Sequence, residues 1–432
     1  MTVFQYAKEN ASKLFREPAG QLRYPFIVPG ATYQFELWDW DSWLTDVALC
    51  QVLEEDISRL QQGCVLNFLD HMDADDRIPM MITPDKQLPK VLDLSTNGHK
   101  PCLAQHAAFI VKHTGDAAWL APYFDKLQRF VRSFMKHNRH DCGLYYWIDD
   151  CAIGVDNDPC IFYRPHKSSG SIYLNCLMYK ELEAMVYLGE KLSVDVAEFA
   201  AEAEHLKTAI RDLCYDERDG MYYSVDLNLL PVDPDQWLHR GAPRHWDCLI
   251  QRIGSWSGFL AMWSGIATQE QAERMVRENL LCEKMGYWST GGVRSLSKYE
   301  KMYLVRKSGN PSCWLGPIWG IANYMVFRGL LRYGFEAEAR DLAEKTVSLF
   351  QKDLNECGHL HEYYDPDTCA PVHNAGFQSW NLLGANLEVW LSGNTPVTEF
   401  LIRVYRADRP PGNGVLQTPG ERISRLTFVH SK

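Results

Sequence analysis

Residues 317–354 read PIWGIANYMVFRGLLRYGFEAEARDLAEKTVSLFQKDL, and this stretch decides the fold. Apolar residues recur every three to four positions on both sides of Gly334, which predicts two helices, 317–333 and 335–354. Glycine accepts the positive φ that often ends a helix, so Gly334 suits the junction. Helices joined by so short a connection pack as antiparallel neighbours. The stretch is therefore predicted to form a helical hairpin.

The same helical period recurs upstream. Thr268 and Gln271 have the spacing of a capping box that opens another helix. Further apolar stripes are Tyr123, Leu127, Phe130, Val131 and Phe134; Leu174, Leu177, Met178, Leu182, Met185 and Val186; Leu206, Ile210 and Leu213; and Ala339, Leu342, Ala343, Thr346 and Phe350. Strand-like alternation is sparse. We predict an all-α fold in which about six hairpins close into an (α/α)6 barrel, although the pattern alone does not distinguish this ring from an open α-solenoid.

Composition excludes several classes of protein. The 432 residues are 46% hydrophobic and include 14 Trp, so a large core is available and global disorder is excluded. The formal net charge of -11 argues against a nucleic-acid partner, because such binding depends on basic residues at phosphates. No apolar run approaches the ~20 residues of a membrane-spanning helix, so no membrane partner is expected.

Cysteine usage and the absence of linkers bear on location and domain organisation. Thirteen Cys residues show no CxxC pair and no zinc-site spacing, and the first residues lack an apolar signal segment. We therefore expect free, mostly buried thiols and a cytoplasmic location. No Ser/Gly-rich linker divides the chain, so residues 1–395 are predicted to be a single catalytic domain. Residues 396–432, with Pro410-Pro411-Gly412, are predicted to be a C-terminal surface extension.

Four long segments between helices are rich in Trp, Tyr, Asp, Gly and Pro, and long loops in a compact domain are usually functional. They are residues 26–43, 141–168, 285–314 and 355–380. In the first, residues 36–43 alternate Trp and Asp. An indole face stacks on the apolar face of a sugar, while a carboxylate accepts hydrogen bonds from its hydroxyls. The alternative for this motif is a helix start with Asp caps and Trp core residues.

The second and third segments concentrate ionisable groups. Four aspartates within residues 149–158 suit a general acid whose pKa is raised by burial and like charge, or else a solvated turn. A calcium loop is a further reading, but the EF-hand spacing is missing. Glu362 lies between His361 and two Tyr, where it would serve as a base acting on water, or the segment is a surface loop. His359 and His361 do not share a helix face and HExxH is absent, so neither a metal nor a cofactor is predicted.

Five motifs in this order resemble glycoside hydrolase family 63 and its trehalase relatives, especially mannosylglycerate and glucosylglycerate hydrolases. They are WDWDS (38–42), GVDN (154–157), WLGPIW (314–319), EYYDP (362–366) and GFQSW (376–380). The resemblance spans about residues 25 to 391. It implies an (α/α)6 barrel and hydrolysis of an α-glycosidic bond with inversion of configuration.

The resemblance also implies roles for individual residues. Asp156 would be the general acid that protonates the departing oxygen, and Glu362 the general base that deprotonates water on the opposite sugar face. Inverting enzymes hold these two carboxyl groups roughly 6.5–9.5 Å apart. The motifs imply substrate-binding positions at Trp38, Trp40, Asp41, Gly154, Asn157, Trp314, Trp319 and Trp380. Two residues outside the motifs, Gln105 and Arg164, are added as further candidates.

The sequence departs from the family pattern in one motif. Where relatives often carry Tyr-Trp-Arg before Gly-Pro, this chain has Cys313-Trp314-Leu315. An Arg there suits a glycerate acceptor. Arg164 would supply a positive charge instead, as a bidentate partner of a carboxylate, or it forms a structural ion pair.

The expectation is an inverting α-glycoside hydrolase for a small soluble α-glucoside or α-mannoside, such as glucosylglycerate, mannosylglycerate or a short α-gluco-oligosaccharide. Two alternatives remain open. One is a carbohydrate-binding toroid without catalysis, and the other is a sugar epimerase or isomerase that would use His359 and His361. The sequence does not fix the oligomeric state.

Overall fold

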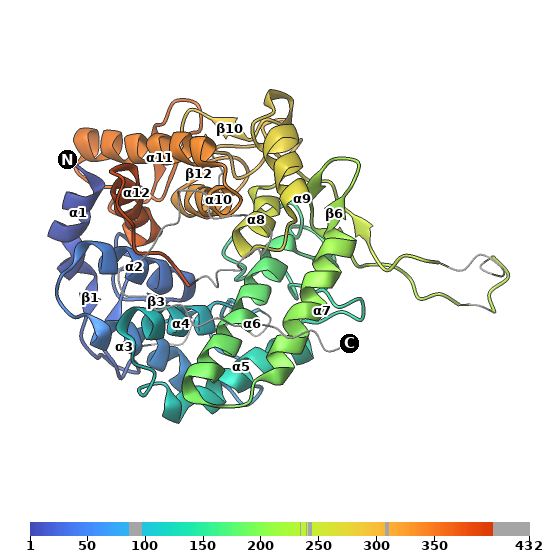
Figure 1. The fold of residues 1–432 in the computed structure, drawn as a ribbon, viewed down its shortest axis with the longest axis horizontal. Coiled ribbons are helices and arrows are strands. Elements are labelled where there is room, and N and C mark those ends of the chain that lie inside the picture. Colours follow the sequence, from blue (N-terminus) through green and yellow to red (C-terminus); the bar gives the residue numbers. More distant parts are fainter. Residues whose placement is uncertain (86–96, 234, 239, 241–243, 307–310, 401–432) are drawn as a thin grey trace, which may run out of the picture.

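In the computed structural model, helices form two concentric rings (Figure 1). The structure describes residues 1–85, 97–233, 235–238, 240, 244–306 and 311–400. The inner ring is α2 (Asp39–Val52), α4 (Leu103–Thr114), α6 (Ile172–Leu192), α8 (Leu260–Ser264), α10 (Gly320–Arg332) and the 3₁₀ turn η7 (Ser379–Leu383) running into α12 (Gly384–Leu391). The outer ring is α1 (Val3–Asn10), α3 (Ser58–Asp70), α5 (Phe124–His137), α7 (Ala197–Cys214), α9 (Gln269–Arg274) and α11 (Glu336–Cys357).

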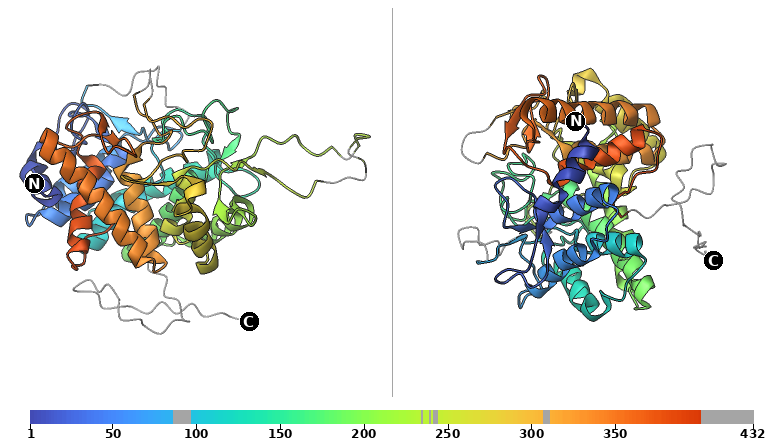
Figure 2. Two further views of the ribbon diagram at one scale, coloured as in Figure 1. Left: turned by 90° about the horizontal axis from the view of Figure 1, so that it is seen from above. Right: turned by 90° about the vertical axis from the view of Figure 1, so that its left-hand side faces the viewer.

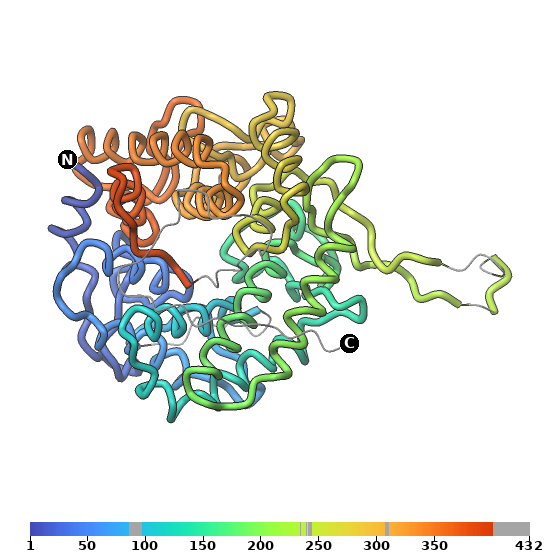
Figure 3. The backbone as a smooth tube through the Cα atoms, viewed as in Figure 1, coloured from blue at the N-terminus to red at the C-terminus, as the bar shows by residue number. Residues whose placement is uncertain are grey.

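The inner ring is closed. Each inner helix packs on the next, and η7 returns to pack on α2. At the outer edge, the carboxylate of Glu388 on α12 accepts the backbone N–H groups of Val3 and Phe4, at 2.9 and 2.8 Å. The tube in Figure 3 shows the same closure, with blue α1 beside the orange and red helices. These contacts confirm the predicted (α/α)6 barrel and exclude an open solenoid.

The connections between helices are long at one end of the barrel and short at the other. The inner helices α2, α4, α6, α8 and α10 are each followed by their outer partner after a shorter connection, as in residues 333–335 between α10 and α11, where Gly334 has φ 80°. The partner of α12 is α1, at the start of the chain. Each outer helix returns to the next inner helix through a long segment. Because the inner helices are parallel to one another, these long segments collect on one face (Figure 2). The segments that contain the sequence motifs therefore meet at the N-terminal ends of the inner helices.

Short strands brace the long segments against each other. The pair β12 (Ile318–Trp319) and β13 (Tyr363–Tyr364) is antiparallel and places Trp319 opposite Tyr363. The remaining pairs are β1 (Phe15–Arg16) with β2 (Phe26–Ile27), β3 (Leu37–Trp38) with β4 (Met81–Ile82), β13 with β14 (Pro371–His373), β5 (Ser169–Gly170) with β8 (Val225–Asp226), β8 with β9 (Leu249–Ile250), β6 (Tyr215–Asp216) with β7 (Met221–Tyr222), and β10 (Trp288–Ser289) with β11 (Gly292–Val293).

The predicted helices are present, with two shifted boundaries. The apolar stripes lie on α5, α6, α7 and α11, except for Tyr123, which ends the 3₁₀ turn before α5. The helix expected from residue 317 begins at Gly320, because Ile318 and Trp319 pair with β13 instead. Residues 39–43, expected in a loop, form the first turn of α2. The helix start considered for that motif is observed with Trp40 and Trp43 buried, but the N-cap residue is Trp38 instead of an Asp.

The C-terminal residues that the structure describes enter the barrel instead of leaving it. In Figure 1 the red segment after α12 turns into the centre of the ring. Glu399 is buried there and accepts hydrogen bonds from Trp263 Nε1, the Tyr324 hydroxyl and Arg328 Nε, at 3.1, 2.6 and 3.1 Å. Phe400 is also buried. Residues 399 and 400 are thus buried against the barrel, residues 401–432 lie outside the described part, and the boundary at 395 stays a prediction.

All thirteen cysteines lie in the described ranges, none of them forms a disulfide there, and only Cys357 is exposed. No helix in the described ranges combines the length and the apolar character needed to cross a bilayer.

The predicted capping box at α9 provides a stability test. The Thr268 hydroxyl accepts the Gln271 N–H at 3.1 Å, and the Gln271 side chain accepts the Thr268 N–H at 2.9 Å. Replacing Thr268 with Ala removes the acceptor and is expected to lower the free energy of unfolding by about 1 kcal/mol. Thermal unfolding should show a small decrease in Tm, whereas Thr268→Ser should keep the wild-type value. An alanine variant as stable as wild type would contradict the role of the cap.

Candidate active site

Carboxyl groups from distant parts of the chain affect the ionisation of Tyr33, which lies in the first long segment. Burial raises the pKa of the Tyr33 hydroxyl, and the carboxylates of Glu362, Asp41 and Asp156 raise it further. An effect of all three on one hydroxyl requires that they lie close to it. Residues 33, 41, 156 and 362 therefore lie near one another, and the two carboxylates predicted to be catalytic are among them.

Glu362 is held in a buried position directly before β13. Its side chain is 5% exposed, Asn374 Nδ2 donates to its Oε2 at 2.8 Å, and His373 Nε2 lies 3.9 Å from the same oxygen. Burial raises the pKa of Glu362 to about 8; the Asn374 bond lowers it, and the charges of Asp41 and Asp156 raise it. Burial and like charge thus outweigh the single hydrogen bond.

Asp41 lies in the first turn of α2. Its Oδ1 accepts the Ser379 hydroxyl at 2.7 Å, which joins the first inner helix to η7. Burial raises the pKa of Asp41 to about 7, against the Ser379 bond that lowers it. Two buried carboxyl groups with pKa values near neutrality in one site are typical of acid–base catalysis.

Four of the predicted sugar-binding tryptophans form a packed aromatic floor. Trp314 stacks on Trp319 with ring centroids 4.0 Å apart and planes 6° apart, and Trp40 contacts Trp314 and Trp380 at 6.0 and 5.2 Å. These rings are 1–4% exposed, so neighbouring side chains cover nearly all of their surface. Trp38 lies apart from this floor, partly buried, edge-on to Tyr33 at 5.5 Å, and its Nε1 donates to Glu36.

A buried ion pair supports the floor from below. Lys100 Nζ lies 2.9 and 3.0 Å from the two carboxylate oxygens of Asp39 and 4.8 Å from the centre of the Trp40 ring. Burial raises the pKa of Asp39, but the interactions with Lys100 and His99 lower it by more. The pKa of Asp39 therefore lies below its ordinary value. The Asp39 carboxylate therefore stays ionised, and the Lys100 ammonium compensates its charge.

Gly154 and Asn157 fix the segment that carries Asp156. A Cβ on Gly154 would lie 2.3 Å from Lys100 Cε and 3.0 Å from Trp40, so only glycine lets the segment pass over these two residues. Asn157 Nδ2 donates to the Ser312 carbonyl at 2.8 Å, and its Oδ1 accepts the Trp314 N–H at 3.1 Å. Both groups were predicted to bind substrate. In the structure Asn157 ties the segment that carries Asp156 to residues 312–314, and Gly154 lets it approach Trp40.

Two predicted binding residues are engaged elsewhere. Gln105 is fully buried on α4, where its amide nitrogen Nε2 donates to the carbonyls of Pro101 and Leu177. Arg164 forms an ion pair with Asp226 on β8, which is the structural alternative considered for it. His361 donates to the carboxylate of Asp353 at the end of α11.

Sequence reasoning missed three residues of this site, Tyr33, Lys100 and Asn374. Tyr33 lies in the first long segment, beside the Trp–Asp motif, and its position there was the only signal. Nothing in the sequence around Lys100 indicates that it is buried against Asp39, which is 61 residues away. Asn374 follows Glu362 by 12 residues, in the same long segment, and only the β13–β14 pairing brings them together.

Comparison with known proteins agrees with this architecture. Residues 34–381 match the model of the mannosylglycerate hydrolase MGH1-like glycoside hydrolase domain. Mannosylglycerate hydrolase MGH1 of Selaginella moellendorffii is 29% identical over 412 residues, covering 79% of this chain and 78% of that protein. The cytosolic neutral trehalase of Kluyveromyces lactis is 30% identical over 413 residues, covering 79% of this chain and 51% of the trehalase. The chain spans about half the length of several curated relatives, including a probable trehalase of Eremothecium gossypii at 52%.

A solved structure shares the fold. The family 63 mannosylglycerate hydrolase of Thermus thermophilus, in complex with Tris, superposes with a TM-score of 0.67 at 18% identity, over 87% of this chain and 98% of that one. The resemblance inferred from the five motifs is confirmed by the match over residues 34–381. The chain belongs to the mannosylglycerate hydrolase-like glycoside hydrolases of family 63.

Proposed function

We propose that the protein hydrolyses the α-glycosidic bond of a small soluble α-glucoside or α-mannoside with inversion of configuration. The observation that carries this proposal is the meeting of Asp156, Glu362 and Asp41 around Tyr33, above a floor of tryptophans. Asp156 would protonate the oxygen of the leaving group, and Glu362 would remove a proton from the attacking water. Asp41 would accept hydrogen bonds from sugar hydroxyls.

The substrate class follows from the relatives and from the contacts of Arg164. The matched proteins are named as mannosylglycerate hydrolases and trehalases, which act on small glycosides by those names. The Arg164–Asp226 pair leaves the proposed anionic-acceptor role of Arg164 unsupported. The proposed substrates therefore include glycosides with a neutral acceptor, such as a disaccharide, as well as those with glycerate. The free cysteines agree with a reducing compartment, and a cytoplasmic location is part of the proposal.

The test is hydrolysis of a panel of α-glycosides followed by proton NMR in the first minutes. The panel contains glucosylglycerate, mannosylglycerate, trehalose, kojibiose and nigerose. We expect at least one to be cleaved, with the β-anomer of the released sugar formed first. First formation of the α-anomer would refute inversion, and incubation with free glucose or mannose that yields an epimer without hydrolysis would favour an epimerase.

The hydrogen bond from Asn374 predicts a change in pH dependence. A base acts in its ionised form, so kcat/KM should rise as the pH passes the pKa of Glu362, which is about 8. Asn374 lowers that pKa, so Asn374→Ala should raise it and move the rising limb of the pH–rate profile to higher pH.

The exposed Asn228 provides the matched control, and Asn228→Ala should leave the profile unchanged. A carboxyl group with this pKa is protonated at neutral pH, which is also what a general acid needs. If the falling limb moves to higher pH in Asn374→Ala instead of the rising limb, Glu362 is the acid and the two roles are reversed.

A further inference from the structure

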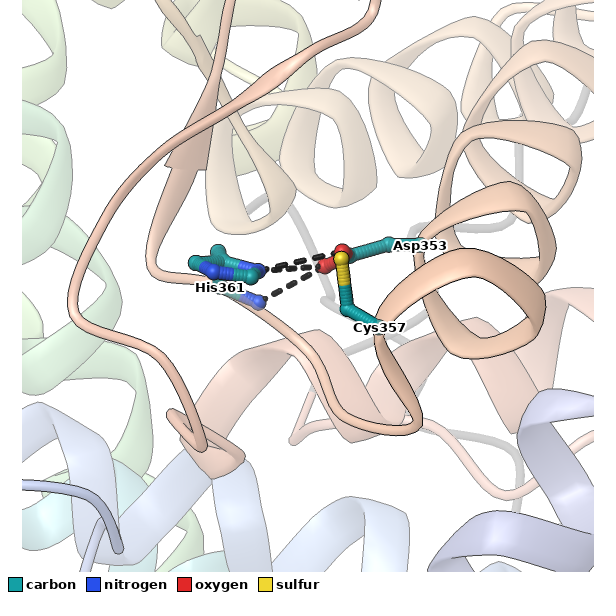
Figure 4. A group of neighbouring side chains, drawn as sticks. All are labelled: Asp353, Cys357 and His361. Carbon is teal, nitrogen blue, oxygen red and sulfur yellow. Dashed lines mark hydrogen bonds and ion pairs between the residues drawn. The ribbon is translucent and has the colours of Figure 1, made fainter.

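Three side chains with metal-binding atoms meet at the C-terminal end of α11, outside the carboxylate site. Asp353 and Cys357 are one helical turn apart on α11, and His361 follows after the helix ends. One ligand atom from each lies within 4.8 Å of the others. Figure 4 shows the Cys357 sulfur and the His361 ring both directed at the Asp353 carboxylate.

The distances are close to those of a zinc site. Zinc bonds of about 2.0–2.3 Å to O, N and S place ligand atoms of a tetrahedron roughly 3.3–3.7 Å apart. His361 Nδ1 lies 3.0 and 2.9 Å from the two oxygens of Asp353. Small movements of the exposed Cys357 and the partly exposed His361 would complete the geometry. Their exposure also leaves an entry path and room for a water as fourth ligand.

The two oxygens of Asp353 have different surroundings. Both lie near Nδ1 of the His361 ring, Oδ1 at 3.0 Å and Oδ2 at 2.9 Å, and Oδ2 also accepts the His361 backbone N–H at 2.9 Å and the Tyr364 hydroxyl at 2.8 Å. Oδ1 is thus the oxygen suited to a cation, while Oδ2 keeps the carboxylate oriented. Hydrogen bonds of this kind to a ligating carboxylate are typical of metal sites.

We propose that Asp353, Cys357 and His361 bind a thiophilic divalent cation, with zinc as the best match. A thiolate and an imidazole select zinc over magnesium or calcium, which prefer oxygen ligands. On binding, the Cys357 thiol releases its proton to solvent, and the His361 ring takes the tautomer with its proton on Nε2. The cation then joins the end of α11 to the segment that leads to Glu362. This site differs from the pair His359 and His361 considered from the sequence, because its other two ligands come from α11.

The test compares zinc binding by the wild-type chain, Cys357→Ala and the matched control Cys282→Ala, using a chromophoric chelator as competitor. Cys357 is exposed at the last residue of α11 and alanine favours helix, so the variant should fold, with an unchanged Tm in the absence of zinc as the check. Cys357→Ala should lose more affinity than the about 10–100-fold that loss of an outer hydrogen-bond partner costs. Cys282→Ala, a partly buried cysteine outside the cluster, should bind as wild type does.

Two further readouts do not depend on hydrolysis. Zinc should raise the Tm of the wild type and of Cys282→Ala, but not that of Cys357→Ala, because a cation that binds only the folded state stabilises it. Cobalt(II) should produce a thiolate-to-cobalt absorption band that Cys357→Ala lacks. Equal zinc affinity in wild type and Cys357→Ala, or no cobalt–thiolate band in the wild type, would overturn the proposal.

Discussion

Replacing Glu362 with Gln or Asp156 with Asn is expected to lower kcat on the best glycoside by about 10²–10⁴-fold each, which is the usual contribution of a general acid or base. Each change keeps the shape of the side chain and removes the carboxylic acid function. Steady-state rates on the substrate found in the panel provide the measurement. Full activity in both variants would refute the assignment of the two carboxylates.

A glycosyl fluoride separates the two roles. Fluoride leaves without being protonated, so Asp156→Asn should recover much of its rate on an α-glycosyl fluoride. Glu362→Gln should remain slow on it, because water must still be deprotonated. The exposed Asp141 and Glu356 provide matched controls, and Asp141→Asn and Glu356→Gln should behave as wild type. Recovery of Glu362→Gln instead of Asp156→Asn would reverse the roles.

Removing Lys100 is expected to cause the largest loss of stability. Lys100→Met leaves the carboxylate of Asp39, which is 1% exposed, without its counter-charge, and breaking a buried pair in this way costs about 3–5 kcal/mol. The variant also loses the side chain on which Trp40 and Gly154 pack. Thermal and denaturant unfolding measure the first effect, and kcat/KM on the same glycoside measures the second.

A double variant tests the physical cause. In Lys100→Met/Asp39→Asn no buried charge remains, so much of the lost stability should return. Lys8 forms an exposed ion pair with Glu54, and Lys8→Met should change stability by less than about 1 kcal/mol. If the double variant is no more stable than Lys100→Met, the loss comes from packing and not from the unpaired charge.

The fold was predictable where local pattern and turn chemistry agree. The hairpin around Gly334 and the capping box at Thr268 depend on residues close in sequence, and both are confirmed. Ring closure was not predictable, because it depends on contacts such as that of Glu388 with Val3, 385 residues apart. The strand at Ile318 and Trp319 was missed for the same reason, since its partner is β13.

The site was predictable from motifs only as a set of residues. The motifs predict that Asp156, Glu362 and Asp41 belong to one site, and the carboxylates of all three raise the pKa of Tyr33. The pattern did not indicate that Asn157 would bind the neighbouring segment instead of a ligand. An Asn side chain can bind a ligand or another segment of the chain. Only the three-dimensional position of the possible partners decides which of the two it binds.

The closed ring has a consequence for synthesis. Asp41 accepts its hydrogen bond from Ser379, 338 residues later, and Trp40 packs on Trp380, so a nascent chain makes half of the site long before the other half exists. Until η7 and α12 emerge, α2 lacks the neighbour that covers its apolar side. Contacts of such sequence separation form slowly, and uncovered apolar surface favours aggregation. A chain that stops after α11 is therefore expected to remain an incomplete arc without a working site, in need of chaperones.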